Sequence, residues 1–267
     1  MSPTRLVAAL VALLALASAP SHGRAGAWTL AAGTGQAIVT LRHLEADRAF
    51  DAAGRLVRAG AYRKTELSVL VERGVTDALT LFAQGTLQAK TVTAPTPDER
   101  MGPDYTEFGL RARLARREGV VVSAQGSLRV PGADDEGAPA EIGATGLETD
   151  TRLLAGRGFS LGGMTGWVDL QGGRRFRDGA PPDEWRVDAT LGLRPRPEWM
   201  AILQAFGRVA AGEGRGGFPE ATAIDLQGSL ARDLSPLWTV QAGAVGTVWG
   251  REAARELGGF VSLWRRF

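Results

Sequence analysis

Charged side chains recur at every second position in several short segments of this 267-residue chain. Most of the cations are arginines, and a guanidinium binds a carboxylate or a phosphate through two parallel hydrogen bonds. Such residues suit the binding of an anionic or polar solute, or pairing with one another. The alternating pattern places on one common face Lys64, Glu66, Lys90, Glu107, Arg111, Arg113, Arg129, Asp150, Arg152, Arg186, Asp188 and Asp225.

Three of these arginines come from neighbouring segments and have two interpretations. Arg111, Arg113 and Arg129 would form a basic strip for an acidic sugar. They would equally well form a structural ladder with Glu66 and Glu107, because confined charges need partners or water. The pattern alone leaves both interpretations open.

Bond-making chemistry has little support in the sequence. His43 is the only histidine after residue 25, and no serine lies near it, so we predict no catalytic residue and no enzyme. The glycines of 212–217 fit a dinucleotide pattern but precede Pro219 rather than a helix. Asp134–Glu136 is typical of a solvated acidic loop. With no cysteine, thiolate metal sites and disulfides are excluded, and we predict neither cofactor nor metal.

The first 25 residues have the pattern of a secretory signal peptide. Arg5 precedes an apolar run, Leu6–Leu16, that is too short to span a bilayer as a helix. We expect cleavage after Ala25 rather than after Ala19, which would leave Pro20 just past the cut. The remaining domain, 26–267, has 29 basic and 29 acidic residues, so its balance predicts no nucleic-acid partner.

The elements that position the charges are predicted strands. From Val120 to Val130, apolar or small residues alternate with polar ones, with Val121 the one exception, as in a strand with one apolar and one polar face. Each segment has about the ten residues that a tilted membrane strand needs. We therefore predict an all-β fold, a transmembrane antiparallel up-and-down β-barrel of about twelve strands. Similar alternation covers 79–90, 105–115, 185–194, 224–230 and 238–248, and weaker versions cover 35–50, 61–73, 148–157, 164–177, 199–210 and 255–267.

The connections alternate between short and long. Turn chemistry marks short connections at 74–77, 116–119, 195–198 and 232–236, whereas 51–60, 91–104, 131–147 and 211–220 are longer. We expect the connection 158–163 to be longer than the other turns. Tryptophans at predicted strand ends suit the aromatic girdles of a membrane barrel, and these are Trp185, Trp199 and Trp238.

The C-terminal segment Gly258–Phe267 resembles the terminal strand by which bacterial outer-membrane proteins are recognised for insertion. Phe267 shares a face with Leu263 and Val261, whereas Arg265 departs from the usual apolar residue. This resemblance implies two partners, the barrel-assembly machinery and outer-membrane lipid. It also implies location in the outer membrane of a Gram-negative bacterium.

Most of the mature chain resembles a family of small proteobacterial outer-membrane barrels. The resemblance is carried by 26–36, by Tyr62–Leu67 and by Gly74–Thr80. Members are labelled as transporters. Some are associated with the degradation of aromatic compounds such as phenol, and others with surface polysaccharide. The resemblance implies the fold more strongly than any substrate.

Function in such a barrel depends on the polar face. If the apolar face contacts lipid, the charged face lines the lumen, either as a pore for a small or oligomeric polar solute or as a plugged interior. We expect the pore. The alternatives are a structural or surface-assembly barrel with a plugged lumen, linked to surface polysaccharide, and a soluble periplasmic β module.

Overall fold

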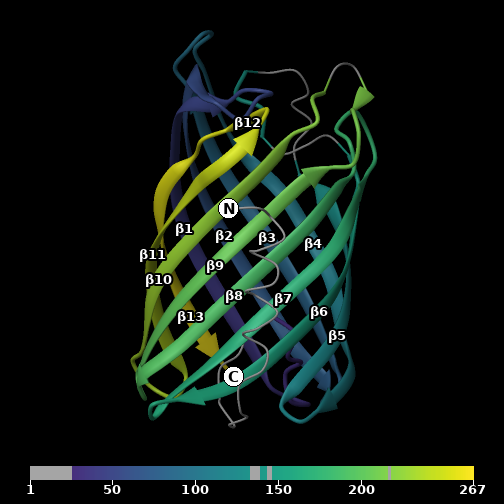
Figure 1. Ribbon diagram of the computed structural model, residues 1–267, viewed down its shortest axis with the longest axis vertical. Helices are drawn as coiled ribbons and strands as arrows, with labels where there is room; N and C mark the ends of the chain where they lie inside the picture. Colours follow the sequence, from purple (N-terminus) through teal and green to yellow (C-terminus); the bar gives the residue numbers. More distant parts are fainter. Residues whose placement is uncertain (1–25, 133–138, 143–145, 216–217) are drawn as a thin grey trace.

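The computed structural model describes residues 26–132, 139–142, 146–215 and 218–267. The chain forms one antiparallel sheet whose tilted strands close into a barrel (Figure 1). The strands are β1 (Gly35–Phe50), β2 (Leu56–Thr76), β3 (Leu79–Val92), β4 (Asp98–Arg117), β5 (Val120–Pro131), β6 (Glu148–Leu161), β7 (Met164–Arg177), β8 (Glu184–Arg196), β9 (Trp199–Ala210), β10 (Thr222–Asp233), β11 (Trp238–Arg251), β12 (Ala253–Ala254) and β13 (Leu257–Arg266).

Closure of the barrel comes from the first strand. β1 pairs with β2 on one side and with β13 on the other, so that Ile38 lies between Leu70 and Trp264. The two-residue β12 pairs with the end of β1 and extends the same closing edge. Twelve long strands therefore form an up-and-down barrel, which confirms the predicted fold class.

Several predicted boundaries were wrong. β6 continues to Leu161, and its connection to β7 is the two-residue turn Gly162–Gly163, not a longer segment. Both glycines have positive φ values, of 56° and 82°, which glycine adopts without strain. β2 and β4 also begin earlier than predicted, so that the loops before them shrink to 51–55 and 93–97.

The two ends of the barrel differ in their connections. The connections after β2, β4, β6, β8 and β10 are short and lie at one end, together with the C-terminal Phe267 (Figure 1). We call this the turn end. The opposite end carries the connections after β1, β3, β5, β7 and β9, and we call it the loop end. Outer-membrane barrels place short turns on the periplasmic side and longer loops outside.

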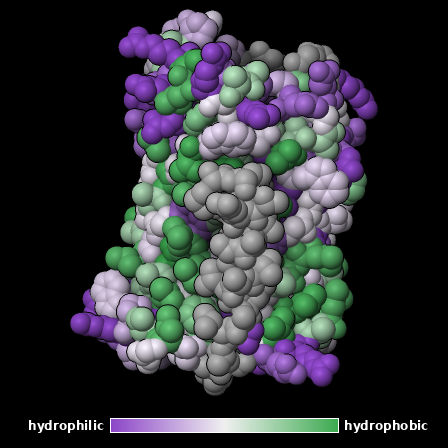
Figure 2. All heavy atoms as spheres, viewed as in Figure 1, coloured by the Kyte–Doolittle hydropathy of each residue, from purple (hydrophilic) through white to green (hydrophobic). Residues whose placement is uncertain are grey.

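The outer surface of the barrel is apolar. Large hydrophobic side chains are exposed along every long strand, among them Leu41, Leu81, Leu153 and Val187. Figure 2 shows hydrophobic residues over the wall and hydrophilic ones gathered at the two ends. In the described part of the chain, no helix has the length and apolarity to cross a bilayer.

Tryptophans lie at both rims of this apolar surface. Trp185, near the loop end, and Trp238, at the turn end, are 51% and 37% exposed. Arg265 lies 5.4 Å from the Trp238 ring, which explains why an arginine is tolerated on the outward face of β13. Trp199 contacts Arg232 in the same way, at 5.3 Å.

The interior near the turn end is filled by apolar side chains. Trp167, Met200, Ile202 and Ala231 form a buried cluster, against which Trp28 and Trp264 pack. Room for these rings comes from inward-facing glycines, since a Cβ at Gly192 would overlap the Trp167 ring.

A segment that precedes β1 enters this end of the barrel. Ala27 is completely buried and packs against Val121 and Leu154 on the barrel wall. Trp28 contacts both this group and the larger apolar cluster. We call residues 26–34 the N-terminal plug.

Candidate solute site in the barrel interior

A cavity of about 490 Å³ occupies the interior toward the loop end. Its walls come from β1–β3 and β6–β11, because the inward positions of each strand alternate with the lipid-facing ones. Cations outnumber acids among the residues that line it. The cations are Arg42, Lys64, Arg152, Arg175, Arg177, Arg186 and Arg208, and the acids are Glu184, Asp188, Asp225 and Glu256.

Two buried carboxylates hold the arginines of one wall. Glu148 is 2% exposed and pairs with Arg129, with Arg177 at 3.0 Å and with Arg175 at 3.6 Å. Asp150 is equally buried and pairs with Arg152 at 2.6 Å and with Arg175 at 3.1 Å. Neither acid lines the cavity, so the carboxylates lie behind the guanidiniums that do.

The opposite wall has a second set of ion pairs. Lys64 lies 2.9 Å from Glu256 and 3.4 Å from Glu66. The Tyr62 hydroxyl donates a 2.6 Å hydrogen bond to the same Glu256 carboxylate. These contacts fix the Lys64 ammonium at the cavity wall.

Arg186 differs from its neighbours. Its Nε is buried with no hydrogen-bond partner, and in the ranges that the structure describes no ion pair joins its guanidinium to an acid. By contrast, Arg208 pairs with Asp225 and Arg152 pairs with Asp188. Arg186 therefore retains unused donors beside the cavity, and a guanidinium in this state favours an anionic ligand.

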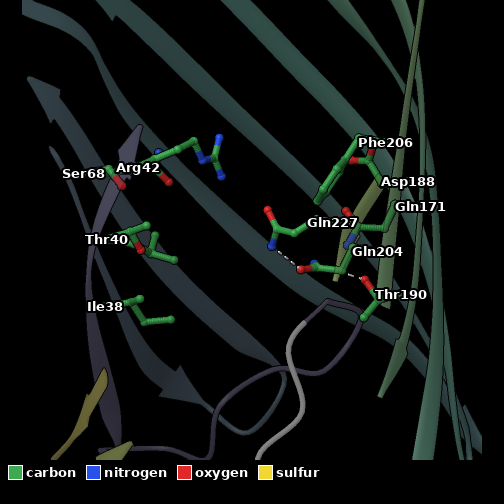
Figure 3. Close-up of a pocket in the computed structure, with 12 residues that line it drawn as sticks. Ile38, Thr40, Arg42, Ser68, Gln171, Asp188, Thr190, Gln204, Phe206 and Gln227 are labelled. Atoms are coloured by element: carbon green, nitrogen blue, oxygen red, sulfur yellow. Dashed lines mark hydrogen bonds between the residues drawn. The ribbon is translucent and has the colours of Figure 1, made fainter. Parts of the chain in front are cut away.

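Two further cavities continue from this one toward the turn end. The middle cavity, about 420 Å³, shares Arg42 and Asp188 with the first and is otherwise rich in amides and hydroxyls. Figure 3 shows Gln204 and Gln227 facing Thr40 and Arg42 across it, with a 2.8 Å hydrogen bond between the two amides. A smaller cavity of about 220 Å³ follows.

The smallest cavity leads past the apolar cluster. It is lined by Gln204 and Gln227 at one end and by Trp167, Trp264 and Arg266 beyond them. The three cavities share lining residues in sequence, so polar space extends along the barrel beside the N-terminal plug. The plug narrows the interior on the side of β3 to β7.

The predicted lumen residues are placed in separate ion-pair groups rather than in one site. Around the loop-end cavity lie Lys64, Glu66, Asp150, Arg152, Arg186, Asp188 and Asp225. Lys90 donates to the Glu141 carbonyl at 3.2 Å and lies 5.4 Å from the Tyr62 ring. Glu107 and Arg129 pair with each other at 3.5 Å.

The predicted basic strip is not formed. Arg111 turns toward the N-terminal plug, where it pairs with Glu72 at 3.3 Å and donates to the Trp28 carbonyl at 3.2 Å. Arg129 instead pairs with Glu148 and Glu107 near the loop end. Arg113 shares the inward parity of Arg111 next to the β4–β5 turn, and its guanidinium has no ion pair within the described ranges.

The ladder interpretation holds in part. Glu107 does pair with Arg129, as a ladder requires. Glu66, however, pairs with Lys64 and Arg42 on the other wall, so it contacts none of the three arginines. The ion pairs of Glu66 and those of the three arginines lie at different places in the barrel. The tilt of the strands separates residues that an alignment of the sequence segments would place side by side.

His43 and two loop motifs lie elsewhere. The His43 ring is exposed on the outer face of β1, where its Nδ1 lies 2.9 Å from the Thr65 hydroxyl. The acidic run Asp134–Glu136 lies outside the described residues. Gly212 and Gly214 lie in the β9–β10 connection, which continues into β10 and not into a helix. Within the described ranges, no group of acids and histidines is arranged to hold a metal.

Sequence reasoning missed the N-terminal plug and the apolar cluster. Inward-facing glycines could have indicated the plug, because a Cβ at Gly156 would overlap the Trp28 ring. Glycine at such a position indicates that another group approaches the wall closely.

Comparison with known proteins shows the same fold. The barrel superposes on an outer-membrane channel from Pseudomonas putida F1 with a TM-score of 0.76, at 14% identity, over 92% of this chain and 100% of that one. It also superposes on the KdgM porin with a TM-score of 0.54, at 10% identity, over 86% of this chain and 99% of that one. A search of protein-family models and of curated proteins gives no match.

The fold and the surface together define the location of the protein. A closed barrel satisfies its backbone hydrogen bonds internally, and its exposed apolar wall with tryptophans at both rims requires lipid. The protein is therefore a β-barrel of the Gram-negative outer membrane. This confirms the predicted location and the predicted contact with membrane lipid.

Proposed function

We propose that the protein is an outer-membrane channel for small or oligomeric solutes that carry carboxylates. The observation that supports this proposal is the layering of charge around the loop-end cavity. Glu148 and Asp150 lie behind the guanidiniums that they hold, and seven cations against four acids line the cavity, so the surface met by a solute is predominantly cationic. Arg186 has unused donors there, and the bidentate geometry of guanidinium matches a carboxylate.

Two solute chemistries fit this cavity. The family resemblance associates such barrels with aromatic compounds and with surface polysaccharide. An aromatic carboxylate and an acidic sugar carry the same anionic group, and a solved structure of similar fold is a KdgM porin in complex with disordered oligogalacturonate. The polar middle cavity, with its amides and hydroxyls, suits the hydroxyl groups of a sugar better than an aromatic ring.

Block of single-channel current by an added solute tests the proposal. In planar bilayers we expect open channels that trigalacturonate blocks at lower concentration than benzoate or a neutral maltotriose. Arg186→Gln should weaken the block by trigalacturonate about tenfold or more, as expected for loss of one charge-assisted contact. Arg63→Gln, an exposed arginine on the same strand as Lys64, should leave the block unchanged. Equal block by trigalacturonate and maltotriose would refute the proposal.

A second candidate function has its own observation. The N-terminal plug and the apolar cluster fill much of the turn end, as in a structural or surface-assembly barrel with a closed interior. Such a protein would show no conductance when folded, and its deletion would alter surface polysaccharide without an uptake defect. Conductance of the folded wild-type protein decides between the two functions.

A further inference from the structure

A buried carboxylate lies beside Gly26 in the N-terminal plug. Asp169, on β7, is 1% exposed and accepts hydrogen bonds from the Ala27 backbone N–H at 2.6 Å and from the Gln171 amide at 2.8 Å. Within the ranges that the structure describes, no lysine, arginine or histidine forms an ion pair with it. An ionised carboxylate buried this deeply is costly unless a positive charge compensates it.

Gly26 fits closely against this carboxylate. Its φ is +90°, and a Cβ added to it would overlap the Asp169 side chain. Only glycine fits, since any other residue would meet both the clash and the backbone strain. Because an added Cβ would overlap the Asp169 carboxyl carbon, the Gly26 backbone, including its nitrogen, lies beside this carboxylate.

We propose that proteolytic cleavage between Ala25 and Gly26 completes this site, and that the new α-ammonium of Gly26 pairs with the Asp169 carboxylate. A peptidase adds one water across the peptide bond, which leaves a carboxylate on Ala25 and an amine on Gly26. The amine takes up a proton, because an α-amino group has a pKa near 8. The cleaved chain thus supplies the charge that the buried carboxylate lacks.

This ion pair anchors the N-terminal plug at its first residue. The next residues are held by the barrel wall, with the Ser123 hydroxyl donating to the Ala27 carbonyl at 2.5 Å and the Leu30 N–H donating to the Thr80 hydroxyl at 2.8 Å. Together they direct the Trp28 ring into the apolar cluster. In the uncleaved chain the Gly26 nitrogen is a neutral amide, so processing controls how firmly the plug is seated.

Insertion of one serine between Ala25 and Gly26 tests the proposal in the full-length exported protein. Cleavage after Ala25 then leaves the ammonium one residue away from Asp169. Intact mass of the protein from outer membranes should show Gly26 as the wild-type amino terminus, and the same mass measurement reads the terminus of each variant. On heating, a folded barrel changes its gel mobility when it unfolds. The temperature of this unfolding transition should be about 10 °C lower in the inserted variant than in the wild type. A serine inserted after Ala53, in the β1–β2 loop, should leave the transition unchanged.

A second variant distinguishes loss of this ion pair from a general perturbation of the plug by the inserted residue. Asp169→Asn should lower the transition by a similar amount, and the combination with the insertion should lower it no further, because both remove one interaction. A wild-type terminus other than Gly26, an unchanged transition in the inserted variant, or additive effects would overturn the proposal. If Asp169→Asn does not fold, the insertion alone decides. Solute block is not used, so this proposal and the channel function fail separately.

Discussion

The two halves of the barrel interior are built from the same strands but filled in opposite ways. Toward the loop end, arginines and carboxylates surround a cavity of about 490 Å³. Toward the turn end, Trp167, Met200 and Ile202 pack with a segment that is not part of the sheet. Strand parity decides which residues face inward, whereas the side chains and the segment that fill the interior decide whether it is a polar cavity or an apolar closure.

The two fillings also differ in their energetics. Burial of the turn-end cluster stabilises the fold through the hydrophobic effect, at about 25 cal/mol per Å² of apolar surface. The loop-end ion pairs contribute little net stability, because the desolvation of two charges offsets their attraction. Loss of one partner is nevertheless costly, since it leaves the other charge buried alone. Substitutions in each half should therefore have separable consequences.

The largest effect is expected for Glu148→Gln in the loop half. One change removes the carboxylate shared by Arg129, Arg175 and Arg177, and we expect a loss of about 3–5 kcal/mol of unfolding free energy. Urea unfolding of the barrel in detergent or lipid measures it. Glu45→Gln, an exposed outward-facing carboxylate, should change stability by less than about 0.5 kcal/mol. An effect as small as that of the control would show that the Glu148 carboxylate does not stabilise the buried arginines.

Trp28→Ala should have the next largest effect on stability, and it should also change the conductance of the channel. Loss of the ring from the apolar cluster should cost about 3 kcal/mol of stability and widen the passage at the turn end, so single-channel conductance should rise. The matched control is Trp185→Ala, which removes the same ring from the lipid-facing surface. If conductance rises equally in both variants, the N-terminal plug does not narrow the channel.

Gly156→Ala should have a smaller effect by the same route. The added methyl group meets the Trp28 ring, and overpacking of this kind costs about 1–3 kcal/mol. Gly126→Ala, where a Cβ has open space, is the control. We expect the Gly156 variant to have a lower unfolding midpoint than the Gly126 variant, and equal midpoints would contradict the close seating of Trp28 against β6.

The sequence predicted the wall better than the contents of the barrel. Val120–Val130 alternates because its outward residues are apolar or small and its inward ones are polar, except for Val121, which packs against the N-terminal plug. The alternation of apolar and polar residues is weaker in β7 and β9. In these strands Trp167, Met200 and Ile202 face inward, so apolar residues lie on both faces. Alternation thus fails where the interior is apolar, which is where the N-terminal plug packs.

The candidate site was predictable in its residues but not in its grouping. Parity places Lys64, Arg152 and Arg186 on the inner face, yet only the tilt and closure of the sheet decide which charges meet. Arg111 and Arg129 lie on adjacent strands but contact different partners at different depths. Nothing in 26–34 has a periodic pattern, so its entry into the barrel could not be predicted from alternation.

The reversal potential of the wild-type channel under a tenfold KCl gradient measures whether the loop-end cavity selects anions. Cations outnumber acids along the wall of the loop-end cavity, so the pore should pass Cl⁻ in preference to K⁺. The reversal potential should therefore have the sign expected for an anion-selective pore. Selectivity for K⁺, or a folded protein that carries no current, would show that the cavity is not an anion-selective passage.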